Sequence, residues 1–364
     1  MTSARRWLLV ALGVALVIGT PLALRAVPAD DSGVSATVLL RQVDASRGAA
    51  YSGYVETLGT LQLPITDQFT DVGDLFGQRT RMRVWWRGAD DWRVDKILAT
   101  GEIDLVHHGN DTTMWDYEKS RVTPMTDPDI RLPRTSDLLP PELARRLLED
   151  VNLSELTRLP AERVVGRDAP GLRLTPRAPQ SSIGHVDLWS DPDTGIPLRV
   201  AVYGKGDTTA AITSAFMQFS TDPPSSADTA FRGPPIAKYQ YDDAVDIADA
   251  ANQYAPFAPP PNVAGLTQSS NSQLRAVGVY GRGVTQMVAI PLWDRASEPL
   301  RQQLEATPGV RLIDEGDLLN VGPLGILLTK LRYDDGGWLI AGTVTDKTLV
   351  TAAHDISEFR AILE

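Results

Sequence analysis

The sequence of residues 78–123 is QRTRMRVWWRGADDWRVDKILATGEIDLVHHGNDTTMWDYEKSRVT. Apolar and polar residues alternate at 81–86, 92–95 and 103–105, and turn sequences rich in Gly, Asp and Asn separate these runs. Successive side chains of a strand point to opposite faces, so the pattern predicts four short antiparallel strands with one apolar and one largely charged face. The apolar face must pack on helices or hold an apolar ligand.

The flanking sequence extends this meander into one α+β domain over residues 34–230. The predicted elements are a helix at 34–49, a strand from Tyr51, a long loop at 63–77, a leucine-rich helix capped by residues 135–137, and strands at 162–165, 171–176, 184–189, 196–203 and 211–219. Together they predict a curved antiparallel sheet with two helices.

A second, smaller α+β domain is predicted at residues 262–364, after a Pro-rich acidic linker at 231–261 that contains a short helix at 242–252. Its predicted elements are strands at 275–280, 285–293, 310–313, 326–333 and 338–344, a helix capped by Ser297 with Pro299 in its first turn, and a C-terminal helix.

Composition narrows the function. The 364 residues carry 46 acidic against 35 basic side chains, a net charge of −11, which argues against a partner bound through nucleic-acid phosphates. The absence of cysteine excludes disulfides, thiolate metal sites, cysteine nucleophiles and acylation of a lipoprotein cysteine.

The N-terminus predicts export. Arg5 and Arg6 precede an apolar run at residues 7–23, and small residues end at Ala29. This is the pattern of a signal peptide over residues 1–29, which is either cleaved or retained as an anchor of residues 7–23 in the cytoplasmic membrane. Both alternatives place the rest of the chain outside the cytoplasm.

Catalytic and metal motifs are weak. His107 and His108 are strand neighbours that point to opposite faces, and the Asp191 turn, which resembles a calcium loop, has Val202 where a ligating carboxylate is needed. We therefore expect no catalytic residue, no metal and no cofactor, and predict that the protein is not an enzyme. A hydrolase with an unrecognised site is the alternative from another class.

The tryptophans and nearby apolar residues either fill the core or line a cavity for an apolar ligand. Trp85 falls on the charged face, beneath an Arg or at a docking rim. The candidate cavity residues are Met82, Val84, Trp86, Trp92, Val94, Ile103, Leu105, Trp115, Leu139 and Leu143.

The order of helix, long sheet, inserted apolar helix and the turn DPDTGIPLR at 191–199 resembles an exported half-barrel family that includes LolA, LolB and the N-terminal domain of RseB/MucB. The segments YSGYV (51–55), RMRVW (81–85) and WDY (115–117) match best. The resemblance covers residues 34–230 and implies a curved half-barrel sheet plugged by helices, with an apolar cavity for acyl chains.

The second domain and the linker favour the RseB/MucB branch. That resemblance implies a periplasmic regulator that binds the acyl chain of a lipid or lipoprotein and a membrane-embedded anti-sigma factor or another envelope protein, and so acts in envelope stress signalling. The alternative is a LolA-like carrier of lipoproteins or lipids across the cell envelope.

Overall fold

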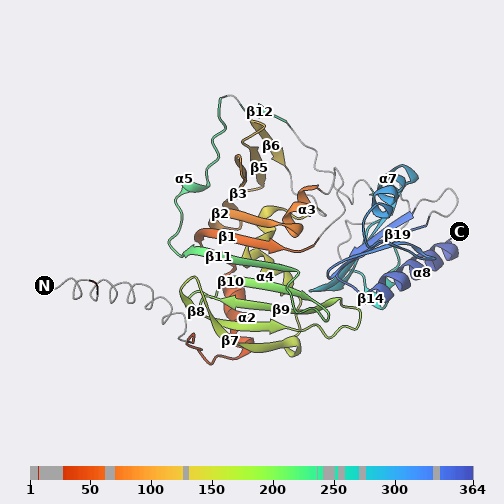
Figure 1. Ribbon diagram of the computed structural model, residues 1–364, viewed down its shortest axis with the longest axis horizontal. Coiled ribbons are helices and arrows are strands. Elements are labelled where there is room, and N and C mark those ends of the chain that lie inside the picture. Colours follow the sequence, from red (N-terminus) through yellow and green to blue (C-terminus); the bar gives the residue numbers. More distant parts are fainter. Residues whose placement is uncertain are drawn as a thin grey trace.

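The computed structural model describes residue 7 and residues 28–61, 70–125, 131–235, 237–240, 251–252, 259–269, 276–330 and 337–363. Two large antiparallel sheets organise these residues (Figure 1). The N-terminal module contains a curved twelve-stranded sheet in the order β12-β6-β5-β4-β3-β2-β1-β11-β10-β9-β8-β7. The C-terminal module contains a six-stranded sheet in the order β15-β16-β20-β19-β18-β17. The chain therefore has the predicted α+β fold of a curved sheet plugged by helices followed by a smaller α+β module.

The N-terminal module agrees closely with the predicted elements. Its helices are α2 (Ala36–Ala45), η1 (Ser46–Gly48), α3 (Thr70–Gly77), η2 (Thr135–Leu138), α4 (Pro140–Leu147), η3 (Leu153–Glu155) and α5 (Ser226–Thr229). Its strands are β1 (Tyr51–Gly59), β2 (Arg79–Gly88), β3 (Asp91–Ile97), β4 (Glu102–His108), β5 (Asp111–Asp116), β6 (Arg121–Met125), β7 (Leu156–Val164), β8 (Arg167–Leu174), β9 (Ile183–Ser190), β10 (Pro197–Gly204), β11 (Ile212–Ser220) and β12 (Lys238–Tyr239).

The meander has five strands, β2 to β6, where the sequence predicted four. The fifth strand forms because a tight turn ending at Ser120, which adopts a positive φ of 49°, reverses the chain after β5. The segment predicted as a loop at 63–77 contains α3, and the rest of that loop lies outside the described residues.

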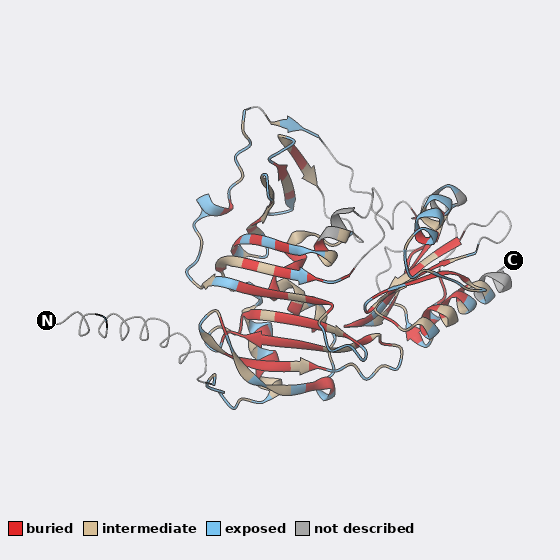
Figure 2. Cartoon of the chain, in the orientation of Figure 1, coloured by how far each residue is buried: buried red, intermediate tan, exposed pale blue. Residues whose placement is uncertain are grey.

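Two helices plug the inner face of the large sheet. The hydroxyl of Ser35 caps α2 by accepting a hydrogen bond from the Val38 N–H (3.3 Å). α4 begins at Pro140, because the first residue of a helix does not need its N–H for a hydrogen bond within the helix. The residues predicted to cap this helix, 135–137, belong to the separate turn η2. Buried leucines and valines of α2 and of the inner face form one hydrophobic core, and Leu143 and Leu147 of α4 pack against it. Figure 2 shows the buried stretches along the strands of the large sheet.

The outer face of the meander carries the predicted charged residues, but part of it is buried. Val106, Trp115 and Val122 are buried on it. The chain after β11 runs past this meander, because α5 packs on β2 and β3 while β12 pairs in parallel with β6 (Figure 1). We call residues 221–235 and 237–240 the strap. Part of the predicted linker is therefore docked on the sheet, whereas most of the helix predicted at 242–252 lies outside the described residues.

The C-terminal module packs two helices on its sheet. Its elements are β13 (Asn262–Val263), β14 (Leu266–Thr267), β15 (Gly278–Arg282), β16 (Thr285–Leu292), α7 (Asp294–Glu305), β17 (Arg311–Leu312), β18 (Gly316–Val321), β19 (Leu324–Thr329), β20 (Gly337–Gly342) and α8 (Asp346–Leu363). α7 begins before the predicted cap, because Ser297 already donates its backbone N–H to the Trp293 carbonyl (2.8 Å) inside the first turn. β18 was not predicted; it is joined to β19 by a turn with Gly322 at a φ of 56°.

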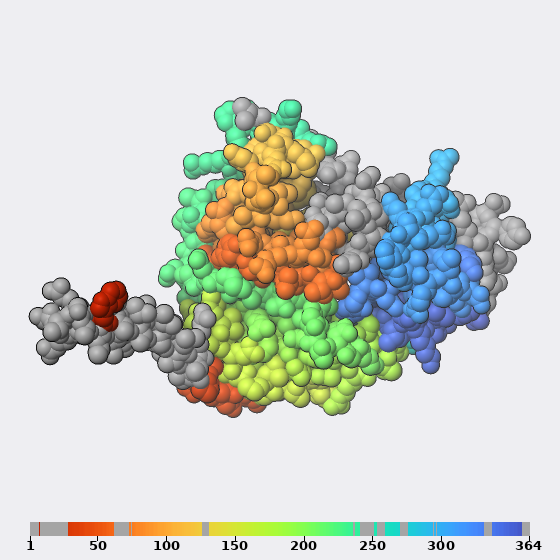
Figure 3. All heavy atoms as spheres, viewed as in Figure 1, coloured from red at the N-terminus to blue at the C-terminus, as the bar shows by residue number. Residues whose placement is uncertain are grey.

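The two modules contact each other directly. Ser181 and Val344 form an isolated antiparallel bridge, and the Thr345 N–H donates to the Gln180 carbonyl at 2.8 Å. Val284, at the tip of the β15–β16 hairpin, belongs to the hydrophobic core of the N-terminal module. In Figure 3 the blue atoms of the C-terminal module abut the green atoms of the large sheet.

The predicted signal or anchor at residues 1–29 lies outside the described residues, apart from Trp7 and residues 28–29. Within the described part of the chain, no helix combines the length and apolarity that crossing a membrane requires.

Candidate ligand sites on the inner face and at the module junction

Most of the predicted cavity residues come together on the inner face of the large sheet. Inner-face strand positions pair across the meander, as in Val84 with Val94 and Val94 with Leu105. The buried members of one cluster are Met82, Val84, Trp86, Trp92, Val94, Leu105 and Leu139, and Leu143 packs against them. These side chains pack with residues of α2, η2 and α4 in one hydrophobic core, so an apolar ligand on this face would displace some of them.

Two of the predicted residues lie outside this cluster, although Ile103 is on the same face as Leu105. Ile103 is half-buried at the end of β4, opposite Lys96 and Asp116. Trp115 is on the outer face, because it pairs with Asp104, while its neighbour Met114 pairs with Leu105 on the inner face. The sequence placed Trp115 wrongly because the turn between β4 and β5 sets which β5 residues face inward.

An aromatic stack crosses the inner face. The rings of Tyr51 and Trp86 are 5.8 Å apart, those of Trp86 and Trp92 5.4 Å, and those of Trp92 and His107 5.2 Å, all nearly parallel. His107, the last ring of the stack, is hydrogen-bonded to the Thr112 hydroxyl (2.9 Å). The Trp92 indole donates to the Ala89 carbonyl (3.1 Å). The stack therefore runs from the centre of the sheet towards its rim.

The buried end of this stack carries an unpaired polar group. Tyr51 is 2% exposed, and its hydroxyl has no hydrogen-bond partner. Burial, followed by the negative charge of Glu142 on α4, raises the pKa of Tyr51 well above its ordinary value, so the phenol stays a donor. A buried donor without an acceptor is costly, and a ligand carbonyl or carboxylate would relieve that cost.

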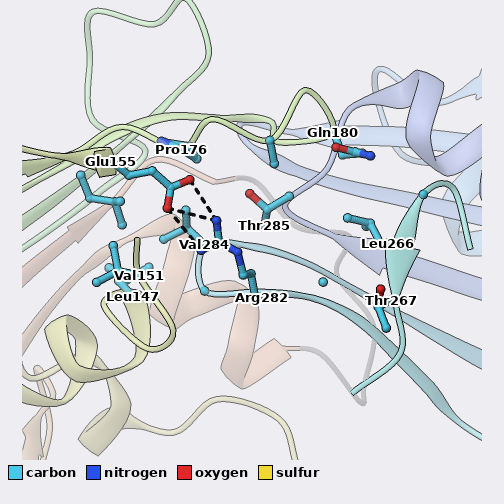
Figure 4. A pocket seen from close by; sticks show the side chains of 15 residues that line it. Leu147, Val151, Glu155, Pro176, Gln180, Leu266, Thr267, Arg282, Val284 and Thr285 are labelled. Carbon is cyan, nitrogen blue, oxygen red and sulfur yellow. Dashed lines mark hydrogen bonds and ion pairs between the residues drawn. The ribbon is translucent and has the colours of Figure 1, made fainter. Parts of the chain in front are cut away.

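A cavity of about 290 Å³ lies at the junction of the modules (Figure 4). This volume is near the lower end of small-molecule pockets. The N-terminal module contributes Leu147, Val151, Glu155, Leu174, Pro176, Ala178 and Gln180, and the C-terminal module contributes Gly265, Leu266, Thr267, Gly281, Arg282, Gly283, Val284 and Thr285. None of the predicted cavity residues lines it.

An ion pair between the modules forms one wall of this junction pocket (Figure 4). Arg282 donates to both carboxylate oxygens of Glu155 at 3.2–3.3 Å and to the Asp150 carbonyl at 2.8 Å. Burial acts to raise the pKa of Glu155, but hydrogen bonds from the Arg177 and Asn152 N–H groups and from Arg282 outweigh it, and the pKa is lowered. Sequence reasoning missed this pair because its members are 127 residues apart.

The motifs considered for metal binding have structural partners. Asp191 accepts hydrogen bonds from the hydroxyl of Thr194 (2.6 Å) and from Arg167 (2.8 Å), which holds the predicted turn. The two histidines outside the His107–His108 pair also have partners, because His185 stacks on Tyr203 and His354 lies 3.0 Å from Glu315. Trp85 lies between the guanidinium groups of Arg83 and Arg93, as one of its two predicted positions required.

No family model matches the sequence, and no curated protein is significantly similar to it. Solved structures are similar in fold. They include MucB in complex with MucA(peri) (18% identity, TM-score 0.48, covering 87% of this chain and 97% of that one) and the MucA/MucB complex of Pseudomonas aeruginosa (19%, 0.48, 87% and 96%). A LolA superfamily protein from Nitrosomonas europaea also matches (15%, 0.21, 52% and 92%).

These structures belong to the group that the sequence resembles. Their identities are below 25% and their TM-scores below 0.5.

Proposed function

We propose that this chain is a non-enzymatic extracytoplasmic binding protein, which binds the acyl chain of a lipid or lipoprotein and regulates a membrane-embedded anti-sigma factor in the manner of an RseB-like regulator. The observation that carries the proposal is the junction pocket, whose walls come from both modules. An occupant of such a pocket contacts both modules at once, so its binding free energy depends on how they are arranged.

The chemistry of the junction pocket suits an amphipathic occupant. Leu147, Val151 and Val284 form an apolar side, and the Glu155–Arg282 pair forms a charged one (Figure 4). Gly281 and Gly283 also line the pocket, at positive φ angles of 93° and 52° that glycine adopts readily. We assign this pocket to the partner segment.

The acyl chain is assigned to the inner face of the large sheet. Its supporting features are the apolar cluster that contains most of the predicted cavity residues and the unpaired hydroxyl of Tyr51. Burying about ten methylenes contributes roughly 8 kcal/mol, which equals a micromolar binding free energy before the entropy of association is subtracted. The acyl chain takes the place of helix side chains, so its binding moves α4. Because Leu147 at the end of α4 and the nearby Val151 line the junction pocket, this movement changes the pocket.

The test uses the purified protein, a palmitoylated peptide and the same peptide without its acyl chain. If the inner face binds an acyl chain, only the acylated peptide should bind. Regulation also predicts binding of the extracytoplasmic segment of a single-span anti-sigma factor, if a neighbouring reading frame encodes one, and weakening of that binding by the acylated peptide. Equal binding of both peptides, or of neither, contradicts the acyl assignment. Transfer of a labelled lipid between two vesicle populations would instead identify a LolA-like carrier.

A further inference from the structure

Three carboxylates and two guanidinium groups gather on the outer face of the meander. Arg83, Asp95 and Asp104 are paired across β2, β3 and β4. Arg93 donates to Asp95 Oδ1 at 2.6 Å and to Asp104 Oδ2 at 2.8 Å, and Arg83 donates to Glu102. Asp95 and Asp104 are only 1% and 4% exposed.

The charges of this network do not balance. With all three carboxylates ionised, the network has one negative charge in excess of its two guanidinium groups. The excess is located at Asp104, because its Oδ1 atom is buried without a hydrogen-bond partner. An unpaired oxygen of a buried carboxylate is costly, even though Arg93 binds the other oxygen, so a positive ligand is expected at Oδ1.

The candidate ligands are a divalent cation and a proton. Oxygen atoms of Asp95, Glu102 and Asp104 lie within 4.8 Å of one another, which is close enough for a shared ion. Calcium requires six to eight oxygen ligands, however, and the guanidinium groups of Arg83 and Arg93 already occupy oxygens of all three carboxylates. A proton requires one oxygen and one acceptor, and Asp104 Oδ1 with the neighbouring Asp95 supplies both.

We propose that Asp104 and Asp95 form a proton-binding site, in which one proton shared by the two carboxyls keeps the strap docked on the outer face and release of that proton to solvent frees the strap. The strap is the stretch that leads from β11 towards the C-terminal module. Its release lengthens the tether between the modules. The proposal does not depend on the proposed function.

The surroundings of Asp104 support proton uptake near neutrality. Burial, followed by the charge of Asp95, raises the pKa of Asp104 to about 7 against the opposing charge of Arg93. The charged groups on the packed strands are Arg83, Arg93, Asp95 and Glu102, and β5 contributes the uncharged Trp115. The strap's Asp228, Arg232 and Lys238 are exposed, and Asp228 is bonded to the Ser225 hydroxyl (2.7 Å).

The sign of the effect follows from the raised pKa. The folded state binds the proton more tightly than the unfolded chain, whose Asp has a pKa of about 3.9. The contribution to stability is therefore complete below about pH 4 and declines as the pH rises towards 7. Above that, the ionised network repels itself on β3 and β4, and α5 of the strap packs on β2 and β3.

The test is limited proteolysis of the full chain, with hydrogen exchange read for the strap peptides at about pH 5.5 and about pH 8.5, on either side of the expected transition. The wild type is expected to lose strap protection at the higher pH. Asp104→Asn mimics the protonated acid and should keep the strap protected at both values. The control is Asp168→Asn. Asp168 is a half-exposed residue of β8 that pairs with Arg163, and this variant should lose strap protection at the higher pH as the wild type does.

Unchanged protection of the wild-type strap at both pH values overturns the proposal, and so does full pH dependence in the Asp104→Asn variant. If that variant does not fold, Trp85 provides a second measurement, because its ring centroid lies 5.6 Å from the guanidinium carbon of Arg93. Its fluorescence should titrate near pH 7 in the wild type and not in Trp85→Phe, while the strap of Trp85→Phe stays pH-dependent. Absence of that titration also overturns the proposal. Protection restored at high pH by calcium alone would identify a metal site instead.

Discussion

At the scale of single residues, Tyr51 offers the sharpest test of the inner face. Its buried hydroxyl has no partner, whereas that of Tyr280, which is also buried, donates to the Pro260 carbonyl at 2.9 Å. Tyr51→Phe should therefore raise the free energy of unfolding by about 1 kcal/mol, while the matched control Tyr280→Phe should lower it by a similar amount. Chemical denaturation measures both changes.

The same substitution should act oppositely on ligand binding. If an acyl ligand accepts a hydrogen bond from Tyr51, palmitate stabilises the wild type more than Tyr51→Phe. Equal stabilisation of the two proteins would remove Tyr51 from the proposed site without affecting the prediction for the ligand-free protein.

Arg282 is the charged contact between the modules. Arg282→Ala leaves Glu155 buried, with two backbone donors but no cation, and should lower the free energy of unfolding by about 1–3 kcal/mol. Arg311→Ala, which breaks an exposed pair with Asp346, is the control and should change it by less than about 1 kcal/mol.

The pH dependence of stability reports on the same pair. The pKa of Glu155 is lower in the folded state, so its contribution is present above the unfolded pKa and is lost as the pH falls through the folded value. Thermal unfolding at pH values between about 3 and 7 should show a smaller acid loss for Arg282→Ala than for the wild type. An identical loss would show that Glu155 does not depend on Arg282.

Residue-level prediction from the sequence worked where a side chain's place depends on its strand neighbours. Alternation placed Met82 and Val84 on the inner face, and adjacency placed Trp85 among arginines. It could not supply the Glu155–Arg282 pair, which only the docking of the modules creates. Alternation also says nothing about whether a buried inner face is filled or hollow.

At the scale of elements, the β15–β16 hairpin is the part of the C-terminal module that enters the core of the other. Val284 at its tip is 7% exposed. Val284→Asp would bury a charge in that core, so the hairpin should leave it and the modules should separate. Small-angle X-ray scattering should show a larger radius of gyration. Gln286→Glu, at an exposed position on β16, is the control and should keep the wild-type value.

The elements missed from the sequence share a physical cause. β12 has two residues and β18 follows directly on another short strand, so neither contains enough alternation to be recognised. β12 exists because β6 offers it an edge to pair with, which is a tertiary effect. The long alternating strands and the amphipathic α2 were predictable because their local pattern agrees with their burial.

At the scale of the whole molecule, several elements of the C-terminal module hold the junction. The β15–β16 tip, the β18–β19 turn and the stretch after β20 all contact the N-terminal module, through Val284, Pro323 and Val344 respectively. A ligand that regulates the protein must prefer one arrangement of these contacts, because equal affinity for two arrangements shifts no equilibrium.

A disulfide across the junction tests this coupling directly. Ser181 and Val344 face each other in an antiparallel bridge, whose Cα atoms at about 4.5–5.5 Å suit a disulfide. The natural chain has no cysteine, so Ser181→Cys with Val344→Cys can form only this bridge within one chain. Locking the modules should change the affinity for the palmitoylated peptide by about fivefold or more, and reduction should restore it. Each single variant, treated with the same oxidant, should bind as the wild type does. Equal affinity of the oxidised and reduced double variant would mean that the acyl ligand does not sense the arrangement of the modules, and the chain would then be better described as a carrier than as a regulator.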